Sequence, residues 1–142
     1  MSVRAENLSF AYGERGVLRH LSLTMAAGER VGILGVSGGG KSTLLKLLSG
    51  LYAPQEGWVE VHGERAPAAI RKQVAMVLQS AALFPASIRE NITCGHPMAE
   101  ETIARACEAA QLSDWIATLP EGLDAFVGER GGKVSGGQAQ RI

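Results

Sequence analysis

The segment from Gly35 to Thr43 carries the pattern with the clearest chemistry, G-x-x-x-x-G-K-S, which is the phosphate-binding P-loop or Walker A motif. Consecutive glycines let the backbone curl tightly, so that its N–H groups form a nest for phosphate oxygens. Lys41 adds a mobile positive charge for the β- and γ-phosphates, and the Ser42 hydroxyl is suited to Mg²⁺. The residues expected to hold the phosphates are Gly35, Ser37, Gly38, Gly39, Gly40, Lys41, Ser42 and Thr43.

The segments on either side of this loop fit the elements that a P-loop needs. Residues 30–34 are mostly apolar, as expected of a strand that is buried on both faces. Leu44, Leu47, Leu48 and Leu51 recur at helical spacing, which predicts a helix that buries one leucine face and stops near Gly50. The phosphates would then lie at the helix N-terminus, where free N–H groups and the helix dipole favour anions. The alternative, a chance match in a glycine-rich chain, does not explain these flanking elements.

Composition excludes several classes of protein. The 142 residues carry a formal net charge of zero, so the chain has no electrostatic footprint for nucleic acid. No apolar run approaches the ~20 residues that cross a bilayer. The N-terminal segment, with charges at Arg4 and Glu6, does not resemble a signal peptide. Cys94 and Cys107 lack metal-ligand spacing, so we expect reduced packing thiols in a cytosolic protein.

The rest of the chain divides into a strand-rich part and a helix-rich part. Apolar patterns predict strands at 3–10, 17–25, 58–62 and 74–78 and a helix at 67–72. Beyond Gln79, helices are predicted at 88–92, 99–110 and 114–119, followed by a loop over 120–133. We therefore expect a β-rich nucleotide-binding part at 1–79 and a helical part at 80–142.

The order of three motifs resembles the nucleotide-binding domain of an ATP-binding cassette (ABC) transporter. The P-loop is followed by Gln79 at the end of an expected strand, and then by the sequence SGGQ at 135–138. The resemblance covers the whole chain. It implies an α/β P-loop NTPase (RecA-like) core with an N-terminal antiparallel β subdomain and an α-helical signature subdomain. It also implies ATP and Mg²⁺ as the bound cofactors.

The resemblance carries roles over to further residues. Tyr12 matches the aromatic residue that stacks on adenine, and the alternative is a rim tyrosine that packs beside Phe10. Gln79 matches the catalytic Q-loop residue, which reaches Mg²⁺ and the attacking water. The signature motif binds the γ-phosphate of ATP held on a second subunit, and the alternative is an ordinary serine-capped helix. The residues that match this motif are Ser135, Gly136, Gly137 and Gln138.

Two further segments resemble cassettes of the exporter type. Residues 87–92 resemble the segment after the Q-loop, and residues 126–131 resemble the X-loop, although Glu129 and Arg130 can also be read as a solvated charge pair. The resemblance implies a second nucleotide-binding domain in a head-to-tail dimer. It also implies contacts with transmembrane domains through the Q-loop and X-loop, no nucleic-acid partner, and a place at the cytoplasmic face of the membrane. Val134 and Ala139 depart from the usual residues without affecting ATP contact.

Two further elements of the family follow the signature motif and would lie beyond Ile142. They are the Walker B strand, which carries the Mg²⁺-binding Asp and the catalytic Glu, and the switch histidine. We therefore expect a sequence that is incomplete at its C-terminus and does not hydrolyse ATP by itself. The interpretation is the ATP-binding part of a transporter ATPase that couples ATP binding and hydrolysis to export. A non-catalytic ATP-binding module, truncated or degenerate, is the alternative. A soluble cassette acting on nucleic acid or ribosomes is disfavoured by the neutral charge and the X-loop match, and a P-loop GTPase by the absence of an N-K-x-D element.

Overall fold

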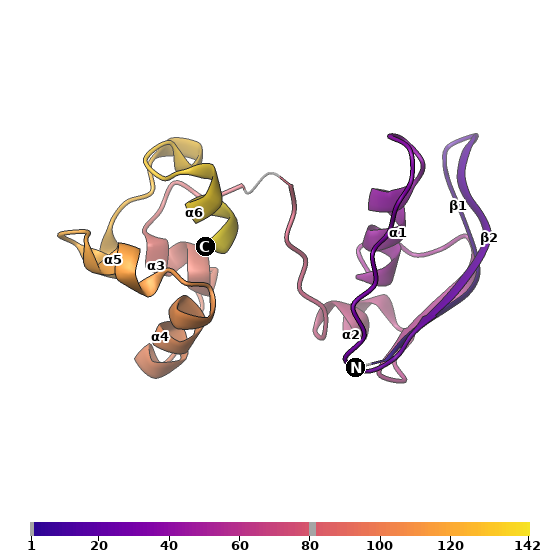
Figure 1. Cartoon of the computed structure of the whole chain (residues 1–142), viewed down its shortest axis with the longest axis horizontal. Coiled ribbons are helices and arrows are strands. Elements are labelled where there is room, and N and C mark those ends of the chain that lie inside the picture. Colours follow the sequence, from indigo (N-terminus) through magenta and orange to yellow (C-terminus); the bar gives the residue numbers. More distant parts are fainter. Residues whose placement is uncertain (1, 80–81) are drawn as a thin grey trace. The chain divides into compact units, whose positions relative to one another are not determined.

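The computed structural model describes residues 2–79 and 82–142 (Figure 1). These residues divide into two units, Met1–Met76 and Val77–Ile142. Each unit has its own group of buried apolar side chains, so the two are described separately.

The first unit is built on a three-stranded antiparallel sheet in the order β2-β1-β3. β1 (Val3–Tyr12) and β2 (Arg15–Met25) are joined by a tight turn in which Gly13 has φ +58°, and β3 (Glu56–Val61) pairs with the other edge of β1. Alternation along the strands places apolar residues on one face. The residues that this face buries are Val3, Ala5, Leu8, Leu18, Val59 and Val61. The predicted strands at 3–10, 17–25 and 58–62 are confirmed, with small shifts at their ends.

Helix α1 (Lys41–Leu48) covers that apolar face, and the short helix α2 (Pro67–Arg71) adds Ile70 to the same core (Figure 1). Gly50, at φ +71°, ends α1 in a Schellman motif, in which the Gly50 N–H donates to the Leu47 carbonyl and the Leu51 N–H to the Lys46 carbonyl. The predicted stop at Gly50 is confirmed. The prediction that Leu51 extends the buried leucine face is wrong, because the chain turns away first and leaves Leu51 52% exposed.

The two predicted buried strands at 30–34 and 74–78 are also wrong for the described chain. Neither segment pairs with a strand among residues 2–79 and 82–142. Leu34 is 96% exposed and Val77 is 79% exposed, whereas Ile33 and Val74 pack in part against the first core. An apolar run becomes a strand only when a neighbour accepts and donates its backbone hydrogen bonds. The apolar pattern identified both segments correctly as apolar, but it could not predict whether a neighbouring strand pairs with them.

The second unit consists of short helices and turns. The elements are α3 (Ile88–Thr93), α4 (Glu100–Ala109), α5 (Ser113–Ala117), the 3₁₀ turns η1 (Gly122–Asp124) and η2 (Glu129–Gly131), and α6 (Gly136–Arg141). Their shared core contains Ile88, Ile103, Cys107, Leu112, Ile116 and Val127. The three predicted helices at 88–92, 99–110 and 114–119 are confirmed, while the two 3₁₀ turns within the predicted loop 120–133 were not foreseen. Burial raises the pKa of the Cys107 thiol, as expected of a packing residue.

Charged and polar contacts connect the elements of this second unit. The Arg89 side chain on α3 donates a 2.9 Å hydrogen bond to Asp124 Oδ1 in η1 and another hydrogen bond to the Glu100 carboxylate in α4. The hydrogen bond to Asp124 is the main cause of the raised pKa of Arg89. A capping box starts α3: Ser87 Oγ accepts from the Glu90 N–H, and Glu90 Oε2 accepts from the Ser87 N–H. These contacts fix where α3 begins and how it faces its neighbours.

The Glu90 cap predicts a specific acid response. The backbone and side-chain hydrogen bonds from Ser87 lower the pKa of Glu90. Its stabilising effect is therefore complete above the unfolded-state pKa of about 4.3 and is lost as the pH falls through the lower folded-state value. We expect the protection factors of the Ser87 and Glu90 amides against hydrogen exchange to fall below about pH 4. Glu90→Gln keeps an acceptor without a titrating group, so this variant should lack that acid-dependent step; an identical step in both proteins would contradict the assignment.

Candidate nucleotide-binding site

The glycines of the P-loop hold a conformation that other residues avoid. Gly38 has φ +77° and Gly40 has φ +84°, and the Gly39 N–H donates 3.1 Å to the Val36 carbonyl to close a tight turn. Gly40 is the N-cap of α1, and a Cβ added there would lie 3.0 Å from Val17 Cγ1 and 3.1 Å from Leu18 Cδ2. The loop is therefore seated against β2, at a distance that only glycine permits.

The first turn of α1 is left open to a ligand. Gly40 makes no side-chain cap, and no acidic residue lies in the first turn. The first N–H groups of a helix have no partner within the helix, so they attract anions together with the helix dipole. Lys41 folds back over the loop and its Nζ donates 2.8 Å to the Gly35 carbonyl and 2.7 Å to the Val36 carbonyl. Phosphate oxygens can replace these two carbonyl oxygens as the acceptors for the Lys41 ammonium group.

Tyr12 lies beside this turn, at the end of β1. Its Oη shares a 3.4 Å hydrogen bond with Thr43 Oγ1, and this bond is the main cause of the lowered Tyr12 pKa. The ring packs edge-on to Phe10, with centroids 5.1 Å apart, yet Tyr12 remains 46% exposed. Packing beside Phe10, the alternative reading of Tyr12, therefore occurs, and it leaves a large part of the ring available. The structure brings the predicted base-stacking residue and the P-loop helix together.

Sequence reasoning missed a third ring in this region. Tyr52, in the turn that follows α1, stacks on Phe10 with centroids 5.4 Å apart and an interplanar angle of 9°. Its ring is 6.0 Å from that of Tyr12, at 80°. No periodic pattern marks Tyr52, because it lies outside the helix that carries the leucine face. The only signal in the sequence was an aromatic residue two positions after Gly50.

The remaining predicted site residues lie in the second unit. Gln79 is exposed, and its carbonyl accepts a 2.8 Å hydrogen bond from Gln140 Nε2 on α6. Ser135 and Gln138 form a capping box: Ser135 Oγ accepts from the Gln138 N–H at 3.2 Å, and Gln138 Oε1 accepts from the Ser135 N–H at 2.8 Å. The serine-capped helix, weighed as the alternative to a signature motif, is thus present. It accounts for Ser135 and Gln138 but not for the glycines between them.

Among the residues that the structure describes, none requires glycine at positions 136 and 137. Neither Gly136 nor Gly137 has a positive φ, and a Cβ added at either would meet nothing within 4 Å. Glycine in a helix costs about 0.5–1 kcal/mol relative to alanine. The two exposed glycines in the first turn of α6 leave its backbone open to close approach.

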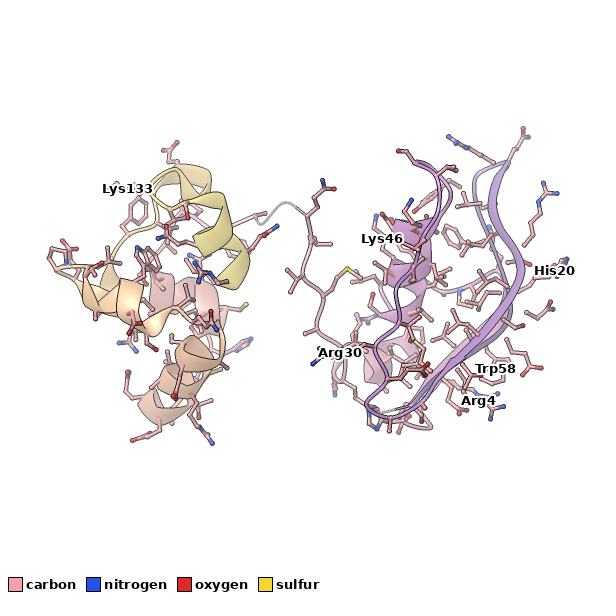
Figure 2. The ribbon with its side chains drawn as sticks, viewed as in Figure 1. Arg4, His20, Arg30, Lys46, Trp58 and Lys133 are labelled. Atoms are coloured by element: carbon pink, nitrogen blue, oxygen red, sulfur yellow. The ribbon has the colours of Figure 1, made fainter. Side chains whose placement is uncertain are left out.

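The segment predicted as the X-loop is anchored at its start. The Ile88 N–H donates 3.0 Å to the Ala125 carbonyl, and the Val127 N–H donates 3.1 Å to the Ala86 carbonyl. Val127 is buried, whereas the neighbouring Phe126 is 48% exposed, and Lys133 Nζ lies 5.5 Å from its ring (Lys133 is labelled in Figure 2). A rigid attachment with an exposed aromatic side chain is suited to contact with another protein.

Two observations bear on cofactor and membrane. Within residues 2–79 and 82–142, no group of three or more His, Cys, Asp or Glu side chains is arranged to hold a metal ion. The exposed Ser42 hydroxyl next to Lys41 fits Mg²⁺ that arrives with a nucleotide, because phosphate oxygens then supply further ligands. None of the described helices has the length and apolar character to cross a bilayer.

Comparison with known proteins gives a consistent result. A family model described as "ABC transporter" matches residues 18–142. The "Iron-sulfur clusters transporter ATM1, mitochondrial" of Candida glabrata is 44% identical, over 99% of this chain and 20% of that protein. An "ATP-dependent lipid A-core flippase" of Syntrophus aciditrophicus is 40% identical, over 99% of this chain and 24% of that protein. The chain thus spans about a quarter of the length of such relatives.

Among solved structures, a bacterial Atm1-family ABC exporter with ATP bound is similar in both sequence and fold. The TM-score is 0.87 and the identity is 40%, over 99% of this chain and 26% of that one. This likeness confirms the predicted fold class of an α/β P-loop NTPase with an antiparallel β subdomain and a helical subdomain.

Proposed function

Because this chain belongs to the ABC transporter family, we propose that it forms the ATP-binding part of an exporter that couples ATP binding and hydrolysis to transport across a membrane. The observation that carries the proposal is the open first turn of α1. This turn follows the glycine loop directly, and its first residue, Lys41, places its ammonium group on the loop carbonyls. An uncapped helix N-terminus with a neighbouring ammonium group is a phosphate site. The relatives that match along 99% of the chain are named as ATP-dependent flippases and transporters.

In this proposal, different residues of the first unit bind different parts of the nucleotide. The loop N–H groups and Lys41 hold the phosphates, and Tyr12 stacks on the adenine, an interaction typically worth about 1–3 kcal/mol. Ser42 would ligate Mg²⁺ with the phosphate oxygens, and the bound ion would supply charge stabilisation to the transferring phosphoryl group. Thr43 completes the phosphate contacts and links them to Tyr12.

The residues of the second unit act at the boundary with other domains. Gln79 is proposed as the catalytic Q-loop residue that reaches the Mg²⁺ and the attacking water. Gly136 and Gly137 allow the backbone of α6 to approach the γ-phosphate of ATP held by a second nucleotide-binding domain. The open space around both glycines supports this role. Two ATP molecules would then lie between two cassettes in a head-to-tail dimer.

Transport requires that the conformational change of dimer closure is transmitted to transmembrane domains. We propose that Gln79 and the exposed Phe126 of the X-loop contact transmembrane domains, which places the chain at the cytoplasmic face of the membrane. The firm attachment of the X-loop to the segment before α3 supports a mechanical role, because a rigid element transmits displacement. The formal net charge of zero gives no support for a nucleic-acid partner.

Gly137→Ala tests the proposal by separating folding from activity. Its Cβ has open space within the chain, so we expect an unchanged or slightly raised melting temperature, since alanine is the better helix former by up to about 1 kcal/mol. The steady-state ATPase rate of the protein that carries this chain should fall at least about tenfold, because a contact made in the closed dimer is obstructed.

Gly16→Ala is the matched control, because Gly16 also lacks a positive φ and a Cβ there would meet only the flexible Arg19 side chain. An unchanged ATPase rate in Gly137→Ala would contradict a phosphate contact at the signature. ATP binding by the wild type without turnover would instead favour the non-catalytic ATP-binding module.

A further inference from the structure

We propose that Tyr52 is a positioning residue for the nucleotide base, because its ring and that of Phe10 hold Tyr12 in the orientation in which it stacks. This inference rests on the proposed function of Tyr12. The three rings form one cluster: Phe10 and Tyr52 are parallel, and Tyr12 stands at 85° to Phe10 and at 80° to Tyr52. Edge-to-face contacts of this kind favour one ring orientation over others.

Tyr52 is itself firmly held. The Lys46 carbonyl accepts from the Leu51 N–H at 2.9 Å and from the Tyr52 N–H at 3.1 Å, so the backbone of Tyr52 is fixed to the end of α1. Lys46, on α1 (Figure 2), places its ammonium group 5.2 Å from the Tyr52 ring. The ring also packs against the first core together with Phe10. Tyr52 is therefore a rigid support, and its position follows that of the P-loop helix.

Tyr12, by contrast, depends on its neighbours. It is the last residue of β1, directly before the Gly13 turn, and it is 46% exposed. Its hydrogen bond to Thr43 Oγ1 is long, at 3.4 Å, and therefore weak. A ring that is free to change rotamer must be ordered when the base binds, and that ordering reduces affinity. The contact with Tyr52 removes this cost before the nucleotide arrives.

The arrangement predicts which part of the ligand Tyr52 affects. Tyr52 is not part of the glycine loop, and Lys41 makes its contacts with the Gly35 and Val36 carbonyls. Removing the Tyr52 ring should therefore weaken the recognition of the base and leave that of the phosphates unchanged. An effect through general unfolding would weaken both.

The test compares two ligands, MgATP and magnesium tripolyphosphate, which lacks the base and ribose. Their dissociation constants are measured by calorimetry on the protein that carries this chain, as wild type, Tyr52→Leu and Tyr52→Phe. Leucine keeps an apolar side chain against the core without a ring, and phenylalanine keeps the ring without the hydroxyl. We expect Tyr52→Leu to weaken MgATP about twofold to tenfold, with tripolyphosphate unchanged and Tyr52→Phe close to wild type. In a Tyr12→Ala background, Tyr52→Leu should have no further effect on MgATP.

Wild-type affinity of Tyr52→Leu for MgATP would overturn the inference. Equal weakening of both ligands, or an undiminished effect of Tyr52→Leu in the Tyr12→Ala background, would also overturn it. Failure of the proposed function has a different signature, since neither MgATP nor tripolyphosphate would then bind the wild type in a manner that depends on Lys41.

Discussion

Replacing Gly57 by alanine is expected to destabilise the first unit by about 2–5 kcal/mol, the sum of left-handed backbone strain and a steric clash. Gly57 has φ +78°, and a Cβ there would lie 2.2 Å from the Glu6 carbonyl oxygen and 2.4 Å from that of Asn7. Both atoms belong to the backbone of β1, which pairs with β2 as well as β3, so they cannot move aside as a flexible side chain would. The loss is a large part of the 5–15 kcal/mol that stabilises a typical domain.

The close approach exists because β1 is irregular at this point. The pairing of β1 with β3 shifts register between Glu6 and Ser9, and Asn7 has φ +53°. A bulge of this kind bends the strand and brings its carbonyls toward the partner.

Gly63→Ala is the control that isolates the clash. Gly63 also has a left-handed φ, +82°, but a Cβ there would meet nothing within 4 Å. We expect it to cost only about 1–2 kcal/mol. Urea unfolding of the two variants measures both values, and equal losses would contradict the packing of β3 on the bulge.

Replacing Lys41 by alanine is expected to weaken MgATP binding about 10- to 100-fold, because one charge-assisted hydrogen bond is worth about 1.5–3 kcal/mol. Among the described residues, Lys41 Nζ donates hydrogen bonds to the loop carbonyls of Gly35 and Val36. The melting temperature without nucleotide should therefore change little, while the upward shift that MgATP produces should shrink.

Lys72→Ala provides the matched control, since it removes the same charge from an exposed position at the end of α2. Calorimetric titration of both variants separates a local phosphate contact from a general loss of positive charge. If Lys41→Ala bound MgATP as tightly as Lys72→Ala, the phosphate site at α1 would be wrong.

Local signals in the sequence were sufficient for most of the elements. Pro67 at the first position of α2 and Gly50 after α1 act on their own backbone, so their effects were predictable. The P-loop motif likewise identified a loop and helix that the structure confirms.

Features that depend on a distant partner were not predictable in this way. The run at 74–78 is apolar, but whether it pairs depends on a second strand that its own residues do not specify. The same holds for the bulge opposite Gly57 and for the contact of Tyr52 with Tyr12. Hydrophobic periodicity describes one element at a time, and a candidate site is a property of several elements together.

The cap of α6 by itself permits more than one amino acid at position 135. Ser135 Oγ accepts a hydrogen bond from its own helix, and a hydroxyl that accepts in this way still has its proton to donate. Aspartate caps a helix as well as serine does, but it has no proton to donate and would bring negative charge toward an incoming phosphate. A cap that served the fold alone would tolerate aspartate. Under the proposed function it would not, so the choice among good capping residues at position 135 is set by the ligand rather than by the helix.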